Sequence, residues 1–277
     1  MSTATAIAET PEQRAARVTR VLGRVGGWGA ALTLAILAAS VALRLSTSFD
    51  PAGEPVSTLP EVLETVARLG HRLSAMVVSV LAVLAAMIVF STRPWPAGRV
   101  VAMVLILADI GLLAALGRHT PGYRVAAVTL ANVLGGMVLA CAFWWLREDA
   151  LPRTFRGPPR AAAYAWLALA ALVAQSALGA VTSALAMRGD RVLDPLHLAM
   201  GVAFVAFAAL AAWPHLGDPR SRVAARIVAS LAAMQFLLGL ALAQAGATRP
   251  APAGWLHAMI ACALALALVS LAMRSRK

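Results

Sequence analysis

Three histidines at the ends of long apolar stretches are the side chains best placed to do chemistry in this sequence. His71, His197 and His257 each lie within the first turn or two of such a stretch. Placing a titratable residue at that depth in a membrane-spanning helix costs free energy. Each histidine is therefore a candidate functional residue. The alternative is a hydrogen bond from each ring to a neighbouring carbonyl or lipid headgroup. His119 and His215 fall between the stretches, and we expect both to be solvated.

His197 and His257 share one depth, on stretches that we expect to lie side by side in an antiparallel bundle. Zinc usually takes four protein ligands, and Cys141 and Cys262 lie deep in separate stretches. Iron in a porphyrin already has four nitrogens, so two histidines complete a six-coordinate b-type heme site. The sequence has no C-x-x-C-H motif, so we expect heme b to be bound non-covalently.

Small and amide side chains lie on the fifth and seventh spans, which precede the spans of these two histidines. Gly179 and Gly239 let helices pack closely, or leave the slot that a flat macrocycle needs. Gln175 and Gln235 each precede one of these glycines by one helical turn. They are candidate cofactor-binding residues, although each amide could instead bond the other or a backbone carbonyl.

Composition predicts the elements that must position these residues. Of the 277 residues, 61% are apolar and 13% are charged, whereas a soluble domain has about a quarter charged. One helical span needs about 20 apolar residues, and eight stretches qualify: 27–45, 69–90, 100–117, 125–146, 162–186, 195–213, 226–246 and 254–273. We therefore predict an all-α, polytopic membrane protein with eight transmembrane helices in two repeated four-helix bundles, embedded in the lipid bilayer.

The net charge of +12 follows the topology of the spans, which argues against a nucleic-acid partner. Sixteen basic residues fall on the side of the N-terminus: Arg14, Arg17, Arg20, Arg24, Arg93, Arg99, Arg147, Arg153, Arg156, Arg160, Arg220, Arg222, Arg226, Arg274, Arg276 and Lys277. Eight fall on the other side: Arg44, Arg68, Arg72, Arg118, Arg124, Arg188, Arg191 and Arg249. The positive-inside rule predicts a multi-pass protein of the cell (inner) membrane with both termini cytoplasmic. Acids crowd the first outer loop, where residues 60–70 are expected to form a short helix.

A Pro- and Arg-rich linker at the middle of the chain divides the spans into two sets of four. The predicted segments are a cytoplasmic start 1–26, an N-terminal half 27–146, a linker 147–161, a C-terminal half 162–273 and a tail 274–277. The repeat is visible in "QSALGAVTSA" and "QFLLGLALAQA", and it aligns His71 with His197. His257 is aligned with Ala131, so one histidine of a symmetric four is missing.

The order of these motifs resembles the heme A synthase or cytochrome oxidase assembly family. The motifs are "HR" opening the second span, "QxxLGA" in the fifth, a histidine opening the sixth, "QxxLG" in the seventh and "LH" opening the eighth. The resemblance covers residues 27 to 273. It implies that His197 and His257 hold heme b, and that His71 holds heme O while its methyl group is oxidised to the formyl group of heme A. Heme O synthase and cytochrome oxidase components are the implied partners, and an oligomer is compatible with the sequence.

The N-terminal half departs from the family pattern. Ala131 stands where the family has a histidine, and Arg68 stands where it has a glutamate. Glu64 is the remaining candidate catalytic carboxylate, on nearly the same helical face as His71 but about 10 Å further out. Arg68 or Arg72 is a candidate to bind a heme propionate.

These features leave three functions open. The first is an active heme A synthase, a heme-dependent oxidoreductase, that uses His71 alone. The second is a paralogue without catalysis that keeps heme b and acts as an electron-transfer or assembly subunit of a respiratory complex. The third is a transporter or scaffold whose histidines are incidental. Asp109, inside the third span, is expected to pair with an arginine or to relay protons.

Overall fold

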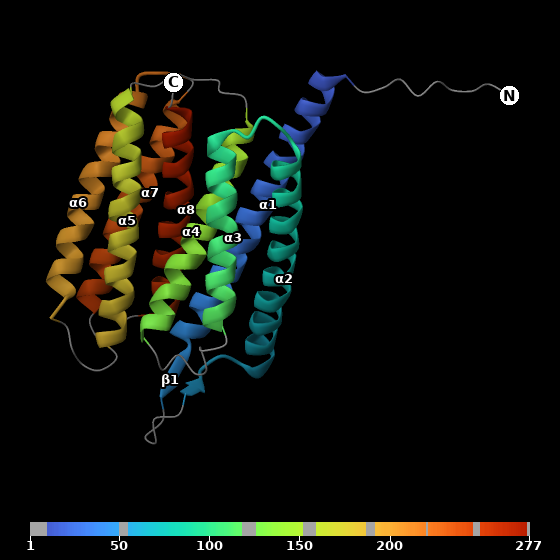
Figure 1. Cartoon of the computed structure of the whole chain (residues 1–277). Coiled ribbons are helices and arrows are strands. Elements are labelled where there is room, and N and C mark those ends of the chain that lie inside the picture. Colours follow the sequence, from blue (N-terminus) through green and yellow to red (C-terminus); the bar gives the residue numbers. More distant parts are fainter. Residues whose placement is uncertain are drawn as a thin grey trace.

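A computed structural model describes residues 10–49, 55–117, 126–151, 159–186, 192–219, 221–245 and 250–275. Within these ranges the chain forms eight long helices (Figure 1), and each is long and apolar enough to cross a membrane. Their bounds are α1 Pro11–Leu45, α2 Glu61–Ser91, α3 Ala97–Gly117, α4 Ala126–Ala150, α5 Pro159–Ala186, α6 Asp194–Ala212, α7 Arg222–Ala245 and α8 Ala251–Arg274. The predicted all-α fold with eight membrane-spanning helices is confirmed.

The first four helices pack in a closed ring, and so do the last four. In the first ring α1 and α3 each contact α2 and α4, and in the second ring α5 and α7 each contact α6 and α8. The rings meet along α4 and α8, with α1 against α8 and α5 against α4 on either side. The same pattern of contacts results when α1, α2, α3 and α4 are matched in order with α5, α6, α7 and α8. Of the eight spans, α8 has the largest buried share.

Two features near the start of the chain differ from the sequence expectations. α1 begins at Pro11, so much of the segment 1–26 is helical and continuous with the span. The cause is a capping box. The backbone N–H of Gln13 donates to Thr10 Oγ1, and the backbone N–H of Thr10 donates to the side-chain oxygen Oε1 of Gln13. The first turns of α1 project beyond the other helices (Figure 1).

The connection between α1 and α2 contains a short antiparallel hairpin of β1 (Thr47–Phe49) and β2 (Pro55–Ser57). The separate short helix expected at residues 60–70 is instead the beginning of α2, which runs unbroken to Ser91. No proline interrupts residues 61–91, so nothing in the backbone stops the helix before the span.

His215 is buried, whereas the sequence suggested a solvated residue between spans. It ends the short 3-10 helix η2 (Trp213–His215) and is fully shielded from solvent. Its Nε2 atom lies 3.0 Å from the hydroxyl of Ser275. The connection between α6 and α7 therefore folds against the end of α8, which gives this histidine a structural hydrogen bond. His119 lies outside the described residues.

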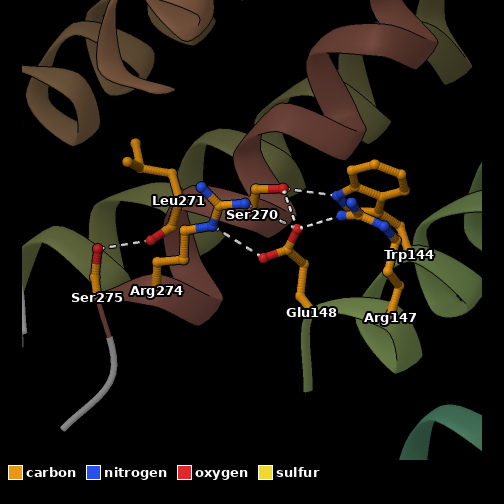
Figure 2. A network of polar contacts seen from close by, with 7 residues as sticks. All are labelled: Trp144, Arg147, Glu148, Ser270, Leu271, Arg274 and Ser275. Carbon is orange, nitrogen blue, oxygen red and sulfur yellow. Dashed lines mark hydrogen bonds and ion pairs between the residues drawn. The ribbon is translucent and has the colours of Figure 1, made fainter. Parts of the chain in front are cut away.

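A network of polar side chains joins the two rings at the end where α1 begins and α8 ends (Figure 2). Glu148 of α4 is its centre, with a side chain only 1% exposed. Its carboxylate accepts hydrogen bonds from Arg147 at 2.9 Å, from Arg274 of α8 at 3.0 Å and from the Ser270 hydroxyl at 3.1 Å. The Trp144 indole N–H in turn donates to Ser270 at 2.7 Å. Buried polar groups need such partners, so this network fixes α4 against α8.

We expect Glu148→Gln to destabilise the protein, because Arg274 and Arg147 would lose the carboxylate that both contact. Hydrogen bonds to charged groups contribute about 1.5 to 3 kcal/mol, and both arginines are partly exposed, so we expect a loss of about 2 kcal/mol. The measurement is the apparent unfolding temperature of the purified protein in detergent. Glu64→Gln, which breaks an exposed ion pair within α2, is the matched control and should change it little. Equal shifts for the two variants would contradict the role given to Glu148.

Candidate cofactor site

The described residues enclose a cavity of about 470 Å³ inside the second ring. All four helices α5–α8 line it, and both His197 of α6 and His257 of α8 face it. Cofactor sites usually have volumes of about 300 to 1,000 Å³ and mostly apolar walls with a few convergent polar groups. The cavity matches that description, since most of its lining residues are apolar or small and its polar side chains include the two histidines, the two glutamines, Arg44 and Asp194.

Each histidine is seated against a glycine of the neighbouring helix. A Cβ atom placed on Gly179 of α5 would come within 2.9 Å of His197 Cε1. A Cβ on Gly239 of α7 would come within 3.0 Å of His257 Cε1. Any larger residue would have to displace the ring, so the two glycines make room for the imidazoles themselves. The sequence had suggested instead that they provide helix packing or a slot for a macrocycle.

The two imidazoles line the same cavity, one from α6 and the other from α8. The prediction that they lie close together came from their shared depth on these two spans.

Gln235 contacts a histidine, which none of the three alternatives for the glutamines anticipated. Its amide nitrogen lies 3.1 Å from His257 Nε2. Because an amide nitrogen only donates, Nε2 accepts and the ring proton lies on Nδ1. Gln175 packs beside α6, with its amide nitrogen 3.1 Å from the position of a Cβ on Gly201.

Several buried polar atoms of this site have no hydrogen-bond partner within the described part of the chain. They are His257 Nδ1, Gln175 Oε1 and Gln235 Oε1. An unsatisfied buried donor or acceptor costs about 1 to 3 kcal/mol, and such groups are rare in native proteins. A polar ligand or water in the cavity would satisfy them. The site thus has the unsatisfied polar groups expected of a binding site.

The donor set suits heme better than a closed metal site. Among the described residues no group of three or more His, Cys, Asp or Glu side chains could hold a metal ion. The Cys141 and Cys262 thiols are both free, and neither belongs to such a group. Two imidazoles in one cavity are sufficient only where the metal brings its other ligands, as iron in a porphyrin does.

The first ring also contributes to the cavity, which sequence reasoning missed. Leu37, Val41 and Arg44 of α1 form part of its wall. α1 is held there by the Trp255 indole of α8, whose N–H donates to the Ala38 carbonyl at 3.0 Å. Arg44 brings a cationic side chain, with a buried Nε atom, to an otherwise largely apolar cavity. Its position at the outer end of the first span was a signal that could have identified it.

The first ring holds His71 differently. His71 Nδ1 lies 2.9 Å from the Ser40 hydroxyl of α1. The residue is half-buried between α1 and α2. Its ring is therefore engaged with α1, through a serine that the sequence analysis did not single out.

The other candidate residues of the first ring lie along α2 and α3. Glu64 is paired with Arg68 one turn along α2, with 2.8 Å between Arg68 Nε and the carboxylate. Arg72 is exposed. Asp109 is buried, and its Oδ1 lies 3.1 Å from the position of a Cβ on Gly135 of α4. No arginine of the described residues pairs with Asp109, in contrast to one of the two expectations for it.

We expect Gly179→Ala and Gly239→Ala to lower the apparent unfolding temperature, because each new methyl group would displace an imidazole. Gly111→Ala is the matched control, since nothing lies within 4 Å of its added Cβ. Replacing a helical glycine by alanine is otherwise favourable by about 0.5 to 1 kcal/mol, so the control should raise the unfolding temperature. A rise for all three variants would show that the His–Gly packing is loose.

No protein-family model matches this chain, and no curated protein matches its sequence either.

Proposed function

We propose that the second ring binds one heme b between His197 and His257, and that the protein carries electrons within the membrane. The observation that supports this proposal best is the pair of imidazoles, each seated on a glycine, in a single cavity of about 470 Å³. When bound, heme b supplies one-electron redox chemistry. The side chains of His197 and His257 would hold it, in a cavity with a mostly apolar wall.

The ligand atoms and their neighbours define what each side chain would do. The lone pair of His257 Nε2 is held by the Gln235 amide, so Gln235 must release this nitrogen before it can bind iron. The amide then remains next to the ring and can bond other polar atoms of the site. Arg44 is the cation best placed to bind a propionate carboxylate, since it lines the cavity whereas Arg72 is exposed.

Heme A synthase activity, which the family resemblance implies, has less support from the first ring. His71 is engaged by Ser40, and Glu64 is paired with Arg68. A catalytic role for His71 would require its ring to leave Ser40. We therefore favour the heme-binding paralogue, as an electron-transfer or assembly subunit of a respiratory complex in the cell membrane with cytoplasmic termini.

We expect the purified wild-type protein to show a b-type reduced-minus-oxidised spectrum, with extracted heme that chromatography identifies as heme b. His197→Ala and His257→Ala should each abolish that spectrum, because each removes one axial ligand. His71→Ala is the matched control and should retain it, since His71 lies in the first ring.

Other outcomes separate the alternatives. Absence of heme from the wild-type protein would overturn the proposal and favour a transporter or scaffold. Co-expression with a heme O farnesyltransferase tests catalysis: heme A that forms in the wild type and is lost in His71→Ala would establish heme A synthase activity.

We expect Arg44→Gln to lower the midpoint potential of the bound heme, because a nearby positive charge favours the reduced state. The expected shift is about 60 mV, which is a tenfold change for a one-electron couple. The heme-to-protein ratio after gel filtration should also fall. Arg72→Gln removes an equal charge from an exposed position and should change neither quantity. Unchanged potential and retention in Arg44→Gln would contradict the propionate contact.

A further inference from the structure

A second hollow in the molecule lies between α1 and α4 and shares no lining residue with the histidine cavity. It has a volume of about 940 Å³ and is lined by the first turns of α1 and the last turns of α4. Three arginines, Arg20, Arg24 and Arg147, contribute to its lining, and no acidic residue does. Two glycines, Gly23 and Gly27, and two tryptophans, Trp28 and Trp144, also line it. We refer to it as the arginine groove.

The sequence of α1 places this groove at the boundary between hydrocarbon and water. Residues 25–43 contain no charged side chain and are bounded by Arg24 and Arg44. At 1.5 Å per residue this stretch spans about 28 Å, which matches a hydrocarbon core of about 30 Å. Arg24 therefore lies at headgroup depth. Trp28, which is 66% exposed one turn further along, lies where interfacial tryptophans collect.

The arginines of the groove differ in how they are held. Arg147 stacks over the Trp144 ring, 4.3 Å from its centroid, and bonds Glu148. Arg20 and Arg24 are exposed and, among the described residues, have no ion pair with a carboxylate. They are four residues apart and therefore lie on one face of α1. Their charge is available to a ligand that approaches from the membrane surface.

We propose that the arginine groove binds the headgroup of an anionic phospholipid. The phosphate would lie against Arg20 and Arg24, and the acyl chains would follow the apolar surface of α1 beyond Trp28 and Ala31. Basic pockets between transmembrane helices are known recognition sites for anionic lipid headgroups. A diffuse attraction would need only surface charge. The groove adds a concave, glycine-lined shape in which the headgroup contacts two helices at once.

The test is native mass spectrometry of the full chain in an uncharged detergent, titrated with dioleoyl phosphatidylglycerol. We expect saturable binding of one lipid, and weaker binding of phosphatidylcholine with the same chains. Arg20→Gln combined with Arg24→Gln should weaken phosphatidylglycerol binding roughly thirtyfold, or about 2 kcal/mol, since each basic residue contributes about half of that. Arg14→Gln, on the same helix but outside the groove, should leave it unchanged.

Three results would overturn the proposal. The first is equal binding of both lipids, and the second is an equal loss for Arg14→Gln, which would indicate diffuse attraction. The third is equally strong binding of glycerophosphoglycerol, which would indicate a soluble phosphate ligand and no requirement for acyl chains. The unfolding temperature of the double variant serves as a folding control, and both replaced side chains are exposed. The outcome does not depend on heme, because the groove and the histidine cavity share no lining residue.

Discussion

The absence of water from the bilayer core is the constraint on which this structure depends. Every backbone polar group there must be bonded within the protein, and the chain meets this requirement with eight helices. A polar side chain in the interior must likewise find a hydrogen-bond partner, because burying it without one costs free energy. The few interior polar residues therefore show where the molecule is fixed and where it has room for a ligand.

Glu148 and the histidine cavity illustrate the two outcomes. The Glu148 carboxylate has three donors from α4 and α8 (Figure 2), so it serves as a junction between the rings. In the cavity, His257 Nδ1 and the glutamine carbonyl oxygens have no partner among the described residues. The first site is complete within the chain. The second has the unsatisfied groups and the open volume that a cofactor would use.

The two rings have the same order of helix contacts and different interiors. In the second ring, glycines seat the imidazoles beside an open cavity. In the first, a Cβ on Gly135 of α4 would meet the Leu113 side chain of α3 at 2.8 Å, so an apolar side chain packs against this glycine. With Ala131 in place of a histidine, this ring has one imidazole, and that imidazole is bonded to α1. The side chains have thus diverged although the helix order is the same.

Sequence patterns predicted the spans, because apolar length is a local property of the chain. They did not predict that α1 lines the cavity of the other ring or that Arg44 reaches it, since both depend on how the rings pack. The contact of Gln235 with His257 depends on the rotation of α7 relative to α8, which a spacing rule does not fix. The burial of His215 depends on where the chain returns against the end of α8. The apolar stretch did not predict where α1 begins, because its capping box lies outside that stretch.

The electron paramagnetic resonance spectrum of the oxidised, purified protein tests the central claim most directly. Two histidine ligands on ferric heme predict a low-spin signal, with one heme per chain, that is unchanged in His71→Ala. A high-spin signal from a stoichiometric heme would contradict the assignment of both axial ligands. Absence of any heme signal would contradict the account of the cavity as a whole.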